Sequence, residues 1–96
     1  MPTYISLLRW TQQGAANVKD SPKRLDAGRE AFKKLGVEIK DTYLTMGRYD
    51  LVCVINGPSD EAVAKALLSL GSQGSVQTET MRAWTEAEYR NIIGSL

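Results

Sequence analysis

Apolar residues recur along the chain with two different periods. Residues 3–11, TYISLLRWT, are rich in β-branched and aromatic side chains and predict a strand. Residues 12–20 are small and polar and predict a loop. The next apolar positions follow helical spacing: Leu25, Gly28, Phe32 and Leu35. Ser21 is the expected N-cap of this helix, Pro22 its first residue and Gly36 its stop.

Two further strands are predicted around a tight turn. Residues 37–45 alternate at first, so that one parity holds Val37, Ile39 and Tyr43. Met46-Gly47-Arg48 can turn a hairpin, because glycine tolerates positive φ. Residues 49–57 are apolar on both parities, which predicts a strand covered on both faces.

The remainder of the chain predicts a helix, a strand and a last helix. Ser59 is a suitable N-cap, and the apolar stripe behind it consists of Ala62, Val63, Ala66, Leu67 and Leu70. Gly71 and Gly74 flank the loop that is expected to follow this helix. Residues 75–84 predict the fourth strand. Thr85 and Glu88 match the capping box of a helix that contains Tyr89, Ile92 and Ile93.

This order of elements, βαββαβ plus a C-terminal helix, predicts a single α+β domain over residues 1–96. The expected fold is the ferredoxin-like plait, a four-stranded antiparallel sheet with two helices on one face. Gly28 is expected to allow close packing of its helix on the sheet. The other face needs a second cover, which is a second copy in a dimeric α+β-barrel arrangement, the C-terminal helix, or the two in combination.

Composition narrows the functional classes. The 12 basic and 11 acidic residues leave a net charge of +1, so we expect neither a nucleic-acid partner nor an anionic membrane partner. With no histidine and one cysteine, we expect no metal site, no His-based catalysis and no bound cofactor. The start, MPTYISLLRW, lacks the pattern of a signal peptide, and we expect a cytoplasmic protein.

Polar residues beside the turn and on the fourth strand are the candidate ligand-binding positions. Asp50 can serve as a general base, but an Asp beside a turn more often accepts hydrogen bonds from nearby backbone N–H groups. Tyr49 can hold a ligand or pack with its hydroxyl in water. The full candidate set is Tyr43, Arg48, Tyr49, Asp50, Thr78, Glu79 and Thr80.

Other notable residues have simpler interpretations. Three arginines can form an anion site if the strands bring them together: Arg9, Arg48 and Arg82. Separate positions on the surface are the more usual outcome for arginines. Cys53 is expected to be a buried, unreactive thiol. Trp10 and Trp84 can stack on a flat ligand or anchor an interface.

The octapeptide YLTMGRYD, residues 43–50, resembles the signature of the GYD-domain family of small bacterial proteins. Its motif positions here are Gly47, Tyr49 and Asp50, and the interposed Arg48 departs from a literal Gly-Tyr-Asp. Residues 4–24 and 70–89 resemble the family's terminal stretches. The resemblance implies a ferredoxin-like, dimeric α+β-barrel domain, and it implies no activity.

Two functions compete at this level. The first is a homo-oligomeric protein of uncharacterised role that binds a small metabolite in the barrel or at an interface pocket, with no catalytic constellation. The second is a cofactor-independent, oxygenase-like enzyme for a flat aromatic substrate. Such an enzyme would use Tyr43, Tyr49, Asp50 or Glu79 around an apolar cavity.

Overall fold

The computed structural model describes all residues, 1–96. Its elements follow the predicted order, with two short additions near the N-terminus. The strands are β1 (Thr3–Trp10), β2 (Glu38–Leu44), β3 (Leu51–Asn56) and β4 (Val76–Ala83). The helices are α1 (Gln12–Ala16), the 3₁₀ turn η1 (Val18–Asp20), α2 (Ser21–Lys33), α3 (Asp60–Ser72) and α4 (Glu86–Gly94).

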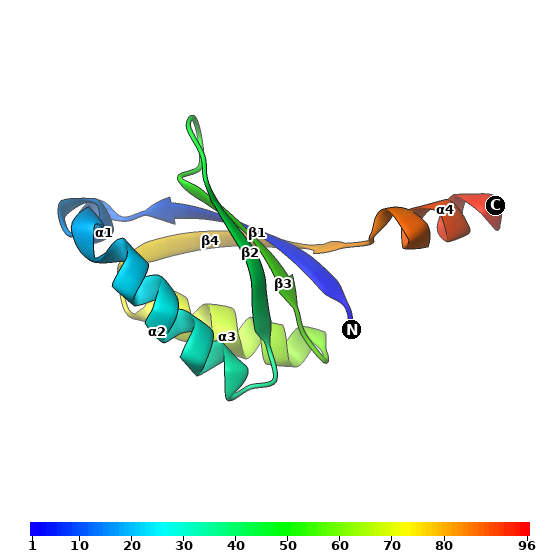
Figure 1. The fold of residues 1–96 in the computed structure, drawn as a ribbon, viewed down its shortest axis with the longest axis horizontal. Helices are drawn as coiled ribbons and strands as arrows, with labels where there is room; N and C mark the ends of the chain where they lie inside the picture. The colour runs from blue at the N-terminus through cyan, green and yellow to red at the C-terminus, as the bar shows by residue number, and fades with distance from the viewer.

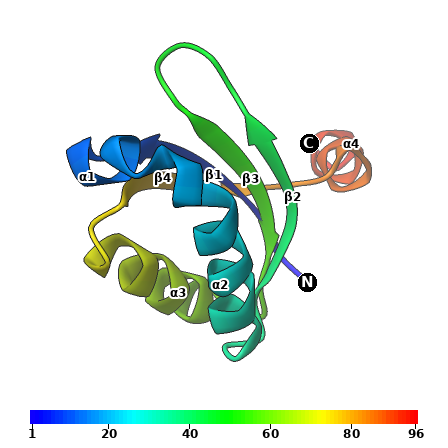
Figure 2. The ribbon, with the colours of Figure 1, turned by 60° about the vertical axis from the view of Figure 1, so that its left-hand side comes forward.

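The four strands form one antiparallel sheet in the order β2-β3-β1-β4. This is the strand order of the ferredoxin-like plait, so the predicted fold class is confirmed. Helices α2 and α3 cover one face of the sheet (Figure 1). In a second view, α4 lies apart from both helices and from the body of the domain (Figure 2).

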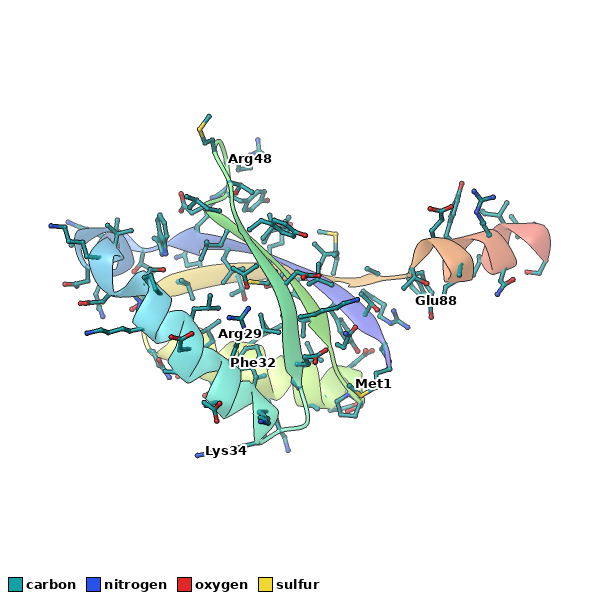
Figure 3. All side chains as sticks on the ribbon, in the orientation of Figure 1. Met1, Arg29, Phe32, Lys34, Arg48 and Glu88 are labelled. Atoms are coloured by element: carbon teal, nitrogen blue, oxygen red, sulfur yellow. The ribbon has the colours of Figure 1, made fainter.

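The core lies between the sheet and the two helices. Phe32 projects from α2 towards the sheet (Figure 3) and is 3% exposed. The buried apolar residues are Tyr4, Leu8, Phe32, Val37, Cys53, Ile55, Val63, Ala66 and Val76. The predicted apolar stripe of α3 supplies Val63 and Ala66, and its other members pack against them. One face of the sheet is therefore buried within a single chain.

The segment predicted as a loop, residues 12–20, is instead α1 followed by η1. Thr11 caps α1 by accepting a hydrogen bond from the Gly14 N–H at 3.2 Å. A Cβ on Gly14 would collide with the Ser75 carbonyl oxygen. The lack of a side chain thus lets α1 pack against the start of β4. The small residues that suggested a loop instead permit this close contact between α1 and β4.

Helix α2 differs in two details from its prediction. Ser21 is the first helical residue, and Asp20 occupies the N-cap position without a side-chain hydrogen bond. A Cβ on Gly28 would meet no atom within 4 Å. The expectation that Gly28 packs closely on the sheet is therefore wrong. Gly36 follows the helix with φ +76°, as expected of a glycine that ends it.

A β-bulge in β2 overturns the predicted parity of that strand. Ile39 pairs with the buried Ile55, but the register shifts between Ile39 and Asp41. One extra residue moves every later side chain to the opposite face. Tyr43 consequently pairs with Val52 and lies on the face away from the helices, where it is 58% exposed.

Both predicted caps of the later helices are present. Ser59 caps α3 by accepting from the Ala62 N–H at 3.2 Å. Thr85 and Glu88 form the full capping box of α4. Helix α4 has no buried residue, and its apolar side chains face solvent. It therefore does not cover its own sheet, and it can cover the second face only in combination with a second copy. No helix is both long and apolar enough to cross a membrane.

Candidate functional site

The sheet face that α2 and α3 leave uncovered, here called the open face, is the candidate functional surface. Side chains alternate along each strand, so the register assigns them to faces. Leu7 pairs with Val52 on one side and Glu79 on the other. The apolar centre of the open face consists of the half-buried Ile5, Leu7, Val52 and Val54, with Met81 beside them at 46% exposure. A continuous apolar strip thus crosses three strands.

The hairpin loop between β2 and β3 borders this face. Gly47 has φ +108°, a left-handed conformation that glycine adopts without steric cost. The loop closes through two bonds from Thr45: its N–H donates to the Asp50 carbonyl at 2.8 Å, and its hydroxyl donates to the Tyr49 carbonyl at 2.7 Å. Arg48 lies on the exposed loop (Figure 3). The loop is therefore closed by bonds among its own residues.

The Asp50 carboxylate contacts the backbone of a neighbouring strand. Its Oδ2 accepts a hydrogen bond from the Trp10 N–H at 2.9 Å, and the Asp50 N–H donates to the Leu8 carbonyl at 2.9 Å. We expected Asp50 to accept from a backbone N–H, and it does, although the donor belongs to β1 and not to the turn. The carboxylate ties the hairpin to the end of β1.

A polar cluster from three segments lies at one end of the open face. The Tyr49 hydroxyl donates to Glu79 Oε2 at 2.5 Å, and the Arg9 guanidinium carbon stands 5.0 Å from the Tyr49 ring centroid. Arg9 Nε also donates to the Arg48 carbonyl at 2.8 Å. Because its hydroxyl donates to a carboxylate, the pKa of Tyr49 is raised above its ordinary value.

A shallow hollow of about 140 Å³ accompanies this cluster. It is lined by Leu7, Arg9, Tyr49, Gln77, Thr78 and Glu79. Ligand pockets for drug-sized molecules measure roughly 300–1,000 Å³, so this hollow in one chain is small for such a ligand. A metabolite at an interface pocket stays a prediction.

The remaining candidate residues lie on different faces or at different ends of the sheet. Thr80 exchanges a hydrogen bond with the buried Ser6 at 2.8 Å on the helix side, and Thr78 has the same parity. Glu79 alone of this run lies on the open face. Arg82 stacks over the Trp84 ring at 4.6 Å, near the C-terminal end of β4. Arg9 lies at the other end of this strand, where it pairs with Gln77. The three arginines therefore do not form one anion site.

Cys53 is 4% exposed, and burial raises the pKa of its thiol. Its thiol contacts the Thr42 hydroxyl at 3.5 Å. An apolar, buried and protonated thiol is a poor nucleophile, as the sequence suggested.

Sequence reasoning did not find that Tyr49 contacts both Arg9 and Glu79. These three residues are far apart in the sequence and meet only through the strand order β3-β1-β4. The register of the sheet is the signal that would have connected them.

Comparison with known proteins supports a common family for the whole domain. The sequence pattern of the GYD domain matches residues 4–93. A curated relative from Thermus thermophilus, the "Glutamine synthetase and cystathionine beta-lyase binding protein", is 37% identical over 84 residues. That alignment covers 86% of this chain and 88% of the relative.

Solved structures show where else this fold occurs. A crystal structure of a protein from Thermus thermophilus is 25% identical with a TM-score of 0.57, covering 88% of this chain and 95% of that one. A feast or famine regulatory protein from M. tuberculosis, complexed with L-methionine, has a TM-score of 0.67 at 15% identity. That alignment covers 88% of this chain but 51% of the regulator, so the chain spans about half its length. At this identity the likeness concerns the fold alone.

Proposed function

This chain belongs to the GYD domain family, and we propose that it is a homo-oligomeric binding module whose partner is a metabolic enzyme. The observation that carries the proposal is the apolar strip of the open face. Two helices cover one side of the sheet, and the opposite side presents Leu7, Val52 and Val54 without a cover from the same chain. Contiguous apolar surface of this kind is characteristic of protein interfaces.

A second copy is the occupant that we propose for the open face. Helix α4 supports this choice, because it carries an apolar stripe at helical spacing formed by Tyr89, Ile92 and Ile93, which are 56%, 44% and 52% exposed. It follows the edge strand β4, so the chain leads it past the border of its own sheet. On a second copy, the stripe would bury apolar surface that one chain leaves in water.

The proposed enzyme partner rests on the curated relative. Its name describes a protein that binds glutamine synthetase and cystathionine beta-lyase, and the alignment covers most of both chains. We propose that this chain likewise binds an enzyme of amino-acid metabolism. Residues 43–50 border the open face and remain exposed at Met46 and Arg48, which makes this hairpin the first region to test for contact with that enzyme.

A cofactor-independent enzyme is the alternative function. Its one favourable observation is the hydrogen bond of Tyr49 with Glu79 beside a hollow. Against it, the Asp50 carboxylate is already bonded to the Trp10 N–H, and the hollow is small for an aromatic substrate. The binding module therefore accounts for more of the geometry.

Self-association is tested by sedimentation velocity at micromolar concentration. We expect the parent to sediment as a dimer or larger closed oligomer of the 10.6 kDa chain. Val54→Asp places a charge in the apolar strip and should give a monomer. Leu68→Asp is the matched control, since Leu68 is 75% exposed on α3, and should leave the oligomer intact. A parent that sediments only as a 10.6 kDa species would refute self-association.

The enzyme partner is tested separately with purified proteins. Glutamine synthetase and cystathionine beta-lyase from the chain's own host are titrated against the immobilised parent by biolayer interferometry. We expect saturable binding of at least one of them, weakened by Arg48→Glu on the hairpin and unchanged by Lys23→Glu on α2. If neither enzyme binds, the proposed partner class is wrong, whatever the oligomeric state.

A further inference from the structure

On the side of the sheet opposite to the proposed interface, a cavity of about 70 Å³ lies between the sheet, α2 and α3. Eleven of its 17 lining residues are hydrophobic, and the deepest belong to the core, such as Phe32, Cys53 and Ile55. Gly28 contributes to its wall, where an added Cβ would meet nothing within 4 Å. The space is therefore a result of the sequence at Gly28, in a helix where glycine is otherwise unfavourable.

Apart from Ser6, which is buried in the middle of β1 and bonded to Thr80, the polar residues that line the cavity gather at one end. Ser21 and Arg24 come from the first turns of α2, Gln73 follows α3, and Ser75 precedes β4. These elements start or finish at the same end of the domain as Trp10, the last residue of β1. The cavity thus has an apolar interior and a polar mouth.

Two groups that line the cavity are open to an anionic ligand, a buried donor without an acceptor and a guanidinium without a counter-ion. The Trp10 indole Nε1–H is buried and makes no hydrogen bond, and no other buried side-chain nitrogen or oxygen shares this property. Such a group costs about 1–3 kcal/mol when unsatisfied. The Arg24 guanidinium donates to the carbonyls of Asn17 and Gly14, but it has no carboxylate partner. An acceptor with negative charge would satisfy both.

The lining and the volume of the cavity also limit the charge and the size of the rest of the ligand. None of its lining residues is Asp or Glu, so a ligand ammonium group would find no counter-ion. Its volume is about half that of the roughly 150 Å³ apolar cavity that holds benzene, which leaves room for a body of a few carbons. An aromatic ring would not fit without movement of the helices.

We propose that this cavity binds a short aliphatic monocarboxylate, with the alkyl body against Phe32 and Leu25 and the carboxylate at the mouth between Trp10 and Arg24. Because one chain forms the whole site on the helix side of the sheet, binding does not depend on the proposed oligomer. A soluble monomeric variant retains it.

The test uses the full chain, 3-methylbutanoate as the probe and the two indole N–H signals of a ¹H–¹⁵N spectrum. The chain has two tryptophans, and Trp84→Phe assigns the signal of Trp10. We expect saturable movement of the Trp10 signal alone, and at least tenfold weaker binding of 3-methylbutanamide and of leucine. An unmoved Trp10 signal, or equal binding of the amide, would overturn the proposal.

Three variants and one control variant locate the ligand. Gly28→Leu fills the cavity and should abolish binding, whereas Ala64→Leu on the exposed side of α3 should not change it. Trp10→Phe removes one hydrogen bond to a charged acceptor and should weaken binding by about tenfold or more, measured by calorimetry because the variant lacks the Trp10 signal. Arg24→Gln should reduce the preference for the acid over the amide. A folded Gly28→Leu protein that binds like the parent would place the ligand elsewhere and refute this site.

Discussion

The carboxylate of Asp50 accepts a hydrogen bond from the backbone N–H of Trp10 at 2.9 Å. This bond connects the hairpin of residues 45–50 to the end of β1. The side chain of Trp10 also lines the cavity on the opposite face of the sheet. A motif residue beside a turn thereby stabilises the sheet at the point where β1 leaves it.

Removing this bond should destabilise the fold to a degree that depends on the substitution. Asp50→Asn keeps an oxygen that can accept, so we expect a modest loss of stability. Asp50→Ala leaves the Trp10 N–H without its partner, and the free energy of unfolding should fall by about 1–3 kcal/mol. Urea unfolding of both variants measures the difference. Equal stability of the parent and Asp50→Ala would show that the bond contributes nothing.

Two glycines should respond to substitution in opposite directions. Gly47 has φ +108°, and Gly47→Ala should lower stability by about 1–2 kcal/mol because a Cβ disfavours that conformation. Gly28→Ala adds a methyl group into free space within a helix and should raise stability by about 0.5–1 kcal/mol. Thermal unfolding of the pair tests both signs, and a destabilised Gly28→Ala would argue against the open space around it.

The Tyr49 hydroxyl should titrate with a pKa above its ordinary value of 10.0, since it donates to Glu79. Its folded pKa is raised, so its contribution to stability is complete below the unfolded pKa and is lost as the pH rises through the folded pKa. The difference between the ultraviolet titration curves of the parent and of Tyr49→Phe isolates the Tyr49 hydroxyl. Glu79→Gln should bring its pKa down towards the ordinary value, and an unchanged titration would contradict the bond.

The capping box of α4 predicts an acid-dependent loss of helix. Glu88 Oε1 accepts from the Thr85 N–H at 2.8 Å, and this bond lowers the pKa of Glu88 below its ordinary value of 4.5. The stabilisation is present above the unfolded pKa and is lost as the pH falls through the folded pKa. Carbon chemical shifts of α4 should report fraying in this range.

A substitution at the other half of the box provides an independent check. Thr85→Ala removes the cap and should destabilise α4 by about 1 kcal/mol at any pH. The shifts of α3, which Ser59 caps, serve as the internal reference in both experiments. Acid fraying of α3 and α4 together would point to global unfolding.

Local patterns in the sequence predict the kind and order of the main elements. The stripe of α3, the caps at Ser59 and Thr85, and the glycines at 36 and 47 depend on contacts within a few residues, which local patterns record. The two-sided apolar character of β3 is visible in the sequence, and Val52 and Val54 lie on the open face; that this face is covered stays a prediction.

Contacts between residues far apart in the sequence depend on how the elements assemble. The bulge before Asp41 moves Tyr43 to the open face, and nothing in the local pattern of β2 marks one extra residue. The bond of Asp50 to Trp10 and the grouping of Arg9 with Glu79 depend on strand register, which is a relation between segments. The space at Gly28 is bounded by residues of the sheet, α2 and α3, which lie far apart in the sequence. Such features follow from how whole elements pack, because packing sums many contacts that no short stretch of sequence contains.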